Sequence, residues 1–243
     1  MFKTLFKKLG FEQKIDELPP EERFFSEIVG YSSIKKLLMR SLISKEPVNI
    51  LLTGPSASSK TIFLLEMMKG LNDAYFIDGV GSSGVGVVDY LFDHPSTKYL
   101  LIDEIDKMKK SDQAALLNVM ETGILSSTKI RKTRERKMRL WIFATSNNLE
   151  KISKPLKSRF LVFYLPEYTY HEFMEIAIKL LYDRYNISTE TASKIAERVW
   201  NELGSKDVRD ILKIGKLVKP EEIDSDINWV IQAYKKYCVN EGQ

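Results

Sequence analysis

Residues 48–61 read VNILLTGPSASSKT, an apolar run followed directly by a turn that ends in Lys60 and Thr61. The run VNILLT predicts a buried strand, and the pattern at 60–69 predicts a helix. A tight turn between a strand and a helix points backbone N–H groups inward, and the helix N-terminus adds positive potential. Lys60 would reach the terminal phosphates of a nucleotide, so we favour a phosphate-binding loop over an ordinary strand-to-helix turn. The loop residues are Gly54, Pro55, Ser56, Ala57, Ser58, Ser59, Lys60 and Thr61.

A second apolar strand ends in two carboxylates. Residues 99–104 read YLLIDE, so Asp103 and Glu104 stand at the carboxyl end of that strand. Charges at the end of a buried strand need a partner that offsets them, and Mg²⁺ with a nucleotide is such a partner. Thr61 and Asp103 would hold Mg²⁺, while Glu104 would orient or deprotonate the attacking water. The alternative is an acidic helix cap, which explains Asp106 better than it explains the other two acids.

Further apolar runs alternate with helical patterns up to Pro166. Strands are expected at 74–78, 139–146 and 160–165, and helices at 32–42, 87–92 and 112–121. Short, wholly apolar strands separated by helices are typical of a parallel sheet covered on both faces. After Pro166 only helical patterns follow, four in number. We therefore predict an amphipathic arm and linker at 1–22, an α/β core at 23–166 and a small all-helical domain at 167–243.

Composition limits the functions that this chain can have. Among its 243 residues, 37 are Lys or Arg and 33 are Asp or Glu. This excess of positive charge is too small for the whole chain to bind nucleic acid as a polycation. The single Cys238 excludes an internal disulfide or a cysteine zinc site, and His94 and His171 are too distant in sequence to suggest a metal site. No apolar run reaches the roughly 20 residues that span a bilayer, so we expect a cytoplasmic protein.

The tryptophans expected in the core are Trp141, Trp200 and Trp229.

Residues 79–84 read GVGSSG and match the G-x-G-x-x-G pattern of dinucleotide-binding loops. The acid expected about 20 residues later would fall near Asp103, which is better used in the Mg²⁺ site. We therefore interpret the segment as a loop after the strand expected at 74–78.

In order and spacing, these motifs resemble those of the AAA+ ATPase superfamily, over about residues 28–217. The resemblance implies a P-loop NTPase fold, with a three-layer αβα core around a parallel sheet and a small all-α lid domain. It also implies ATP and Mg²⁺ as cofactors, with 54–61 as Walker A and 100–104 as Walker B. Ala57 and Ser59 replace glycines that are common in the superfamily, and minichromosome-maintenance helicases also carry a small non-glycine residue before their lysine.

The same resemblance implies roles for further residues. Ile28 and Val29 would touch adenine, and Asn147 would be the sensor 1 residue that bonds the γ-phosphate or the attacking water. Arg159 resembles an arginine finger, which reaches the nucleotide of a neighbouring subunit and so implies a ring, most simply a hexamer. Arg209 resembles sensor 2, which contacts the γ-phosphate. The implied catalytic residues are Lys60, Glu104, Asn147, Arg159 and Arg209.

The segment before Asn147 resembles the inserted hairpin of minichromosome-maintenance, RuvB-type and MoxR-type ATPases. Seven of the eleven residues at 129–139 are Lys or Arg, against one acid. Such a density of positive charge favours contact with nucleic-acid phosphates, although a solvated loop is the alternative. The candidate contacts are Lys129, Arg131, Lys132, Arg134, Arg136 and Lys137.

These features predict an AAA+ ATPase that hydrolyses ATP and couples hydrolysis to remodelling of, or translocation along, DNA. The nearest functional type is a helicase or a RuvB-like branch-migration motor. A MoxR-like chaperone that acts on a protein partner is one alternative. A nucleotide-binding switch that barely hydrolyses is another, because Ser59 replaces the usual glycine.

Overall fold

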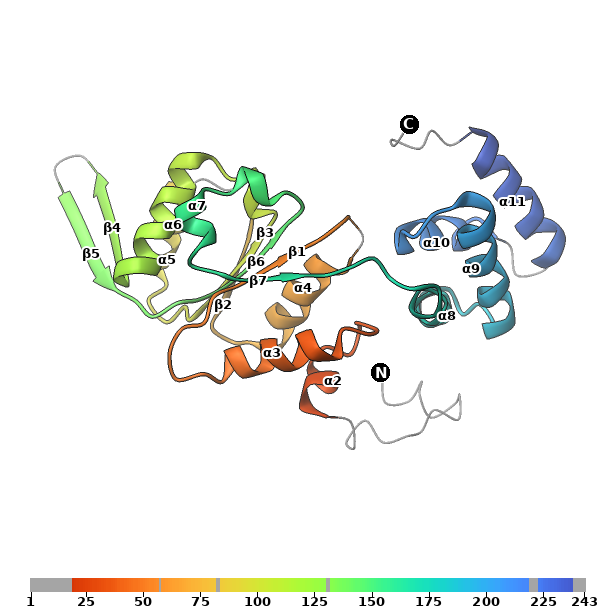
Figure 1. Ribbon diagram of the computed structural model, residues 1–243, viewed down its shortest axis with the longest axis horizontal. Coiled ribbons are helices and arrows are strands. Elements are labelled where there is room, and N and C mark those ends of the chain that lie inside the picture. Colours follow the sequence, from red (N-terminus) through yellow and green to blue (C-terminus); the bar gives the residue numbers. More distant parts are fainter. Residues whose placement is uncertain (1–18, 57, 82–83, 130–131, 219–222, 238–243) are drawn as a thin grey trace. The chain divides into compact units, whose positions relative to one another are not determined.

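The computed structural model describes residues 19–56, 58–81, 84–129, 132–218 and 223–237. The chain divides into two compact units, one of residues up to 54 with 59–165, the other of 55–58 with 166–243 (Figure 1). We call them the core unit and the helical unit. Residues 1–18 of the predicted N-terminal arm and linker lie outside the described residues, and so does Cys238.

A five-stranded parallel sheet forms the centre of the core unit. Its order is β2-β3-β6-β1-β7, and every neighbouring pair is parallel. The strands are β1 (Ile50–Thr53), β2 (Ala74–Asp78), β3 (Tyr99–Asp103), β6 (Trp141–Ser146) and β7 (Leu161–Tyr164). In the register, Thr53 pairs with Ser146 and Ile102 pairs with Ala144. The carboxyl ends of β1, β6 and β3 therefore lie side by side at one edge of the sheet.

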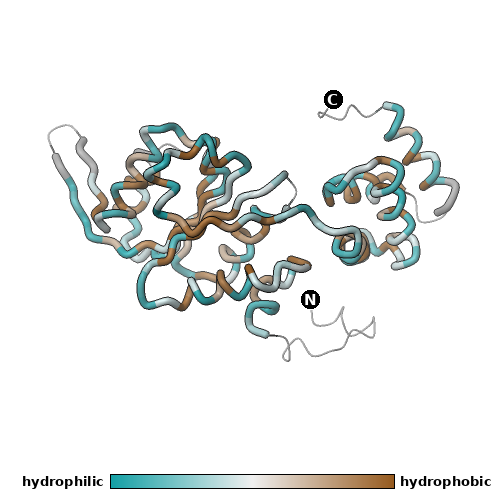
Figure 2. The backbone as a smooth tube through the Cα atoms, in the orientation of Figure 1, coloured by the Kyte–Doolittle hydropathy of each residue, from teal (hydrophilic) through white to brown (hydrophobic). Residues whose placement is uncertain are grey.

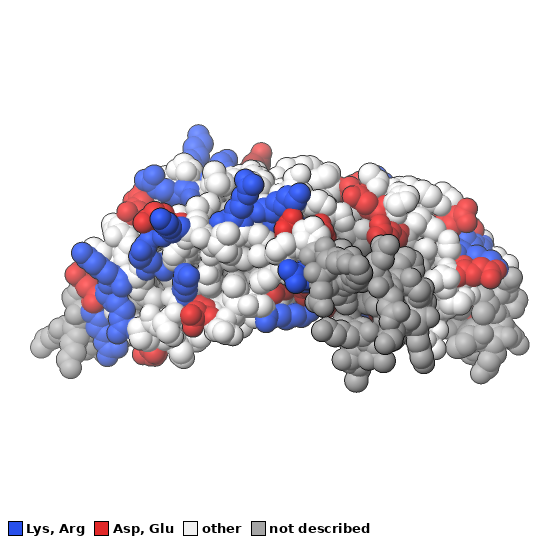
Figure 3. Space-filling model, turned by 90° about the horizontal axis from the view of Figure 1, so that it is seen from below, with Lys and Arg blue, Asp and Glu red and all other residues white. Residues whose placement is uncertain are grey.

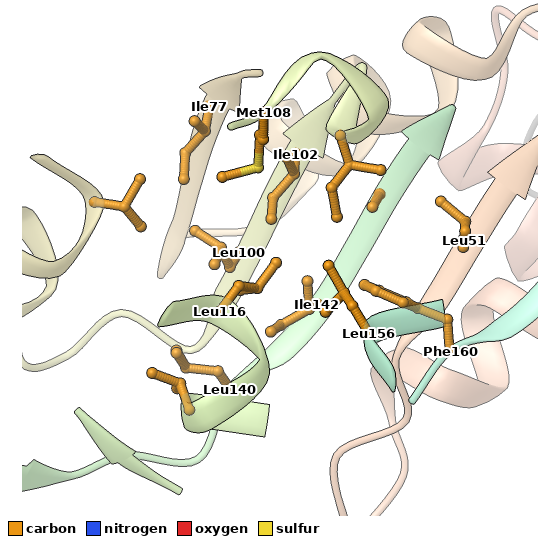
Figure 4. Close-up of a cluster of buried hydrophobic side chains, with 14 of the residues drawn as sticks. Leu51, Ile77, Leu100, Ile102, Met108, Leu116, Leu140, Ile142, Leu156 and Phe160 are labelled. Carbon is orange, nitrogen blue, oxygen red and sulfur yellow. The ribbon is translucent and has the colours of Figure 1, made fainter. Parts of the chain in front are cut away.

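Helices cover both faces of this sheet. One face packs against α2 (Pro20–Phe24), α3 (Ser32–Leu42) and α4 (Lys60–Gly70). The other packs against α5 (Gly84–Asp93), α6 (Lys110–Thr122) and α7 (Lys154–Lys157), where a dense apolar cluster lies (Figure 4). Two short 3₁₀ turns, η2 (Ile105–Lys107) and η3 (Leu149–Lys151), follow β3 and β6.

The alternating direction of side chains along each strand explains the two apolar layers. Leu100 and Ile102 join the α5–α6 layer, whereas Tyr99 and Leu101 join the α3–α4 layer. Successive side chains of a strand point to opposite faces, so a strand apolar throughout must be covered twice. Figure 2 shows the hydrophobic residues concentrated along these strands. The predicted three-layer core with a parallel sheet is confirmed.

A separate two-stranded antiparallel sheet projects between α6 and β6. It consists of β4 (Ile124–Lys129) and β5 (Lys132–Lys137). Its base is held by buried Leu125 and Met138, which belong to the apolar cluster under α5 and α6. The hairpin is therefore built onto the core at one end only.

The helical unit contains α8 (Tyr170–Tyr185), α9 (Thr189–Leu203), α10 (Val208–Gly215) and α11 (Ile223–Tyr237). Thr169 caps α8 in a reciprocal capping box with Glu172, and Gly204 ends α9 in a left-handed conformation. The unit buries residues of all four helical stripes predicted from the sequence, among them Phe173, Val199, Ile211 and Ile231. None of the described helices is long and apolar enough to cross a membrane.

The three tryptophans do not behave alike. Trp141 is buried in β6, and Trp200 is half-buried with its ring edge-on to Phe173. Trp229 is 69% exposed, so its expected place in the core is wrong. On α11 the buried positions are Ile227, Val230 and Ile231, which leave Trp229 on the outer side of the helix.

Candidate nucleotide site

Two side chains 42 residues apart meet where the turn after β1 approaches the end of β3. The Thr61 hydroxyl lies 3.0 Å from each carboxylate oxygen of Asp103 and donates to them. A hydroxyl and a carboxylate are the oxygen donors that Mg²⁺ prefers in nucleotide sites. These two residues therefore suit the Mg²⁺ ion that the sequence predicts.

The turn itself requires unusual backbone conformations. Gly54 has φ 148°, and Ser59, just before α4, has φ 58° and ψ 14°. The left-handed conformation costs a residue with a Cβ about 1–2 kcal/mol, which explains why glycine is usual before the lysine. Ser59 adopts that conformation nonetheless, so the serine preserves the path of the turn at some cost in backbone strain. Ser58 donates to the Pro55 carbonyl at 2.9 Å, while Ala57 lies outside the described residues.

Lys60 begins α4 and is 7% exposed. Its Nζ donates to the Gly54 carbonyl oxygen at 2.9 Å, so the side chain folds back over the turn. The charge of a lysine is rarely buried without a partner. A buried ammonium group inside a turn of this kind is suited to binding phosphate oxygens.

Glu104 is held from both its backbone and its side chain. Directly after β3 it has φ 50° and ψ 49°, a left-handed conformation that is uncommon outside glycine. Its N–H donates to the Thr145 hydroxyl at 2.9 Å, and its Oε1 accepts from the Asn147 side chain at 3.0 Å. The Asn147 N–H in turn donates to buried Asp106, at 3.2 Å. The ends of β3 and β6 are thus cross-linked by polar groups.

Gly79 explains part of the dinucleotide-like pattern. Its N–H donates to the Asp103 carbonyl oxygen at 2.8 Å, and a Cβ at this position would collide with the Glu104 carbonyl oxygen. The glycine lets the loop after β2 pack directly against the backbone of the acidic segment. The first glycine of that pattern therefore serves close packing.

The segment predicted to touch adenine is anchored by a buried lysine. Ile28 is buried, and its carbonyl oxygen accepts from Lys35 Nζ at 2.6 Å. Lys35 is 2% exposed and also pairs with Glu22 at 2.5 Å. Val29 follows, half-buried, before the left-handed Gly30. Lys35 was not among the residues predicted from the sequence, although its spacing from Leu38 and Leu42 on one helical face was a usable signal.

The two arginines with predicted roles at the γ-phosphate are paired with acids. Arg159 is half-exposed, and its Nε and Nη2 lie 3.1 and 2.5 Å from Glu121 Oε1. Arg209 belongs to the helical unit, where hydrogen bonds to Asp207 raise the pKa of its guanidinium group. The roles of Arg159 and Arg209 at the γ-phosphate stay predictions.

The candidate nucleic-acid contacts lie on the hairpin, at the left of the core unit in Figure 3, where Lys and Arg side chains gather. Arg134 and Lys137 are exposed. Arg136 differs, because its Nη1 donates to the Phe92 carbonyl oxygen at 2.8 Å and its guanidinium lies over the Phe92 ring. The side chains of Lys129 and Lys132, and all of Arg131, lie outside the described part of the chain.

The strand order and the contact between the phosphate-binding turn and the acidic end of β3 define a P-loop ATPase of the AAA+ class. Comparison with known families agrees. Residues 21–152, just over half of the chain, match the family described as the MCM P-loop domain. The chain belongs to this family, and the predicted AAA+ resemblance is confirmed.

Individual relatives extend this result. The chain is 31% identical over 157 residues to "DNA replication licensing factor mcm2" of Xenopus tropicalis, covering 52% of this chain and 18% of the relative. It is 22% identical over 241 residues to "Zygotic DNA replication licensing factor mcm6" of the same species, covering 87% of this chain and 28% of that relative. The chain thus spans less than a third of the length of these curated relatives.

Among solved structures, a similar fold is that of the "Thermotoga maritima RuvB Holliday junction branch migration motor". It has a TM-score of 0.65 and 21% identity, covering 89% of this chain and 74% of that one. At this identity the likeness concerns the fold, which includes the helical region after Pro166.

Proposed function

We propose that this chain binds ATP with Mg²⁺, hydrolyses it, and uses the energy to move along DNA or remodel it. The observation that carries the proposal is the meeting of Thr61 with Asp103 beside the buried Lys60. An ordinary strand-to-helix turn has no need for a buried ammonium group, a left-handed serine and a carboxylate from another strand.

In this proposal, the chemistry follows from the residues at the strand ends. Thr61 and Asp103 would hold Mg²⁺, which supplies positive charge to the phosphates when bound. Lys60 would neutralise the developing charge on the γ-phosphate oxygens. The Glu104 carboxylate would orient the attacking water or take its proton, and the hydrogen bond from Asn147 would fix the direction of that carboxylate.

The sites would be completed between subunits of a homo-oligomer, for which a hexameric ring is our proposal. Arg159 would leave Glu121 and reach the nucleotide of a neighbour. Residues 167–243 would act as a lid, with Arg209 contacting the γ-phosphate. Ile28 and Val29 would contact adenine.

DNA is the proposed substrate on two grounds. The names of these relatives refer to DNA replication and to Holliday junction branch migration. In addition, the hairpin presents exposed Arg134 and Lys137 at a projecting edge, where they can reach phosphates without losing a structural role. Helicase action and branch migration are the two forms of activity that this combination suits.

The test is the ATPase rate of the purified chain at fixed salt, alone and with single- or double-stranded DNA. We expect DNA to raise the rate, whereas polyglutamate, a polyanion without bases or sugars, leaves it unchanged. Turnover that is indifferent to DNA would contradict the DNA motor and favour a chaperone acting on a protein. Tight ATP binding without turnover would instead favour a nucleotide switch.

A further inference from the structure

The Thr145 hydroxyl is bonded to both residues of the acidic pair at the end of β3. It donates to Asp103 Oδ1 at 2.5 Å and accepts from the Glu104 N–H at 2.9 Å. Thr145 itself is 1% exposed and lies near the carboxyl end of β6, the central strand of the sheet, between β3 and β1. One buried hydroxyl therefore bridges the proposed metal ligand and the proposed general base.

The donor and acceptor roles in these two bonds follow from the number of protons and lone pairs on the hydroxyl. A threonine hydroxyl has one proton and two lone pairs. A carboxylate can only accept, so the proton goes to Asp103, which leaves a lone pair for the Glu104 N–H. The hydroxyl thus acts as donor and acceptor at the same time. Among side chains of similar size, only that of serine could also make both bonds from this position.

The Asp103 carboxylate consequently accepts hydrogen bonds from two sides. Thr61 approaches from α4 and Thr145 from β6, and both hydroxyls donate to Oδ1. Among the described hydrogen bonds, the one from Thr145 is the bond that holds the Asp103 carboxylate from the β6 side. The backbone of Glu104 is strained, with φ 50°, and its part-buried N–H would lose its acceptor without the Thr145 hydroxyl, at a cost in free energy. The same hydroxyl therefore supports the position of Glu104.

We propose that Thr145 is a positioning residue that sets the Mg²⁺-binding direction of Asp103 and the water-directing position of Glu104. The inference rests on the proposed function and deepens it, since it assigns to β6 a part in both metal binding and turnover. Thr145 touches neither nucleotide nor water in this role; it acts through Asp103 and Glu104.

Two pairs of variants isolate the hydroxyl. Thr145→Val keeps the shape of threonine and removes the hydroxyl, while Thr145→Ser and Thr145→Ala differ from each other in the hydroxyl alone. Thr97→Val is the matched control, because Thr97 is buried in the same core unit but lies before β3, at its opposite end. Thermal unfolding of all four variants measures any loss of stability.

We expect Thr145→Val to lower kcat on the order of 100-fold, the scale of a misplacement of about 1 Å, with KM for ATP little changed. Binding of a fluorescent ATP analogue in EDTA should equal that of the wild type. Mg²⁺ should strengthen analogue binding, and the Mg²⁺ concentration that gives half of this effect should rise about tenfold. Loss of a residue that hydrogen-bonds to a metal ligand usually weakens metal binding on this scale. Serine should restore both properties, alanine should not, and Thr97→Val should change neither.

Several results would overturn the inference. Turnover of Thr145→Val within about threefold of the wild type would do so, as would equal rates for the serine and alanine variants. A loss of analogue binding in EDTA that follows the loss of thermal stability would show a merely structural role. If Thr145→Val fails to fold, the serine and alanine pair still decides the question. Wild-type protein that hydrolyses no ATP would instead contradict the proposed function, while the Mg²⁺ titration of binding would still test Thr145.

Discussion

The nucleotide site and the β4–β5 hairpin both bring together charged side chains, but they hold them in opposite ways. At the nucleotide site, Lys60 is almost fully buried and bonded to the Gly54 carbonyl oxygen, and the Asp103 carboxylate is bonded to the buried hydroxyl of Thr145. On the described part of the hairpin, Arg134 and Lys137 are exposed, whereas Arg136 is bonded to the Phe92 carbonyl oxygen of the core unit.

The difference in burial predicts a difference in how each region fails. Groups fixed in a medium of low dielectric act through position, so that removal of one atom can abolish chemistry. Exposed charges act through counterion release, which adds up residue by residue and weakens with salt. Variants of the nucleotide site should therefore give large losses at any salt concentration, and variants of the hairpin should give graded losses that depend on salt.

The largest effect is expected from Glu104→Gln. Loss of the proposed general base should lower kcat about 10³-fold, while ATP binding persists because the amide keeps the shape of the side chain. Single-turnover hydrolysis and analogue binding measure the two effects separately. Glu150→Gln, an exposed acid of η3, is the control and should hydrolyse at the wild-type rate. A normal rate for Glu104→Gln would remove Glu104 from its proposed role.

Arg159→Ala should also lower turnover, by about 10³-fold if it acts as a finger on the next subunit. Mixing this variant with Glu104→Gln then provides a direct test. Each variant alone lacks one half of the site, and mixed oligomers contain interfaces that have both halves. Partial recovery of hydrolysis on mixing is the expected result. No recovery in oligomers shown to be mixed would place Arg159 outside the neighbour's site.

A smaller and salt-dependent effect is expected from the double variant Arg134→Ala/Lys137→Ala. The slope of log affinity for duplex DNA against log salt should fall by about two, one for each phosphate that the protein no longer neutralises. The control is Lys36→Ala/Arg40→Ala, which removes the same charge from α3. An unchanged slope in the hairpin variant would show that these residues do not bind phosphates.

Asp210 in the helical unit tests whether a polar network without proposed chemistry affects stability alone. Burial would raise the pKa of Asp210, but hydrogen bonds from Lys213, Ser205 and Tyr234 outweigh it and the pKa is lowered. A lowered pKa stabilises the folded state above the ordinary aspartate pKa, and this stabilisation is lost as the pH falls through the folded value.

Asp210→Ala should therefore destabilise the protein by about 1 kcal/mol at pH 7. The deficit should begin to shrink as the pH falls below the ordinary aspartate pKa of about 3.9, and it should vanish below the lowered pKa of folded Asp210. Denaturant unfolding across this pH range measures the difference, with Asp210→Asn as the variant that keeps the shape. A deficit that stays constant with pH would mean that the charge of Asp210 contributes nothing.

The smallest effect is expected from Ser59→Gly. Glycine adopts φ 58° without strain, so the variant should gain up to about 1 kcal/mol of stability, reduced by the greater freedom of glycine in the unfolded chain. Ser188→Gly, at the N-cap of α9, is the control and should lose stability, because the Ser188 side chain accepts from the Thr191 N–H. Destabilisation by Ser59→Gly would mean that the serine side chain has a role that outweighs its strain.

Much of the fold follows from patterns that are local in the chain. The strands at 74–78 and 99–103 and the helix at 32–42 were predicted with their observed bounds, because apolar runs and helical stripes reflect burial directly. The strand predicted at 48–53 begins at Ile50 in the structure. Before Ile50, the Val48 carbonyl accepts from Ser41, a bond outside the sheet that the apolar pattern does not reveal.

The chain order alone also indicated the phosphate-binding turn and the acidic strand end, since each motif is contiguous and its chemistry follows from its residue types. The partners of those residues depend on which strands become neighbours. Thr145 reaches Asp103 only because β6 lies beside β3, and Arg136 reaches Phe92 only because the hairpin packs on α5. Trp229 was misplaced for a related reason: its neighbours on α11 are buried, but the side of the helix that is covered is decided by packing against other helices. Bonds between distant segments have no local signature, so the tertiary structure alone assigned them.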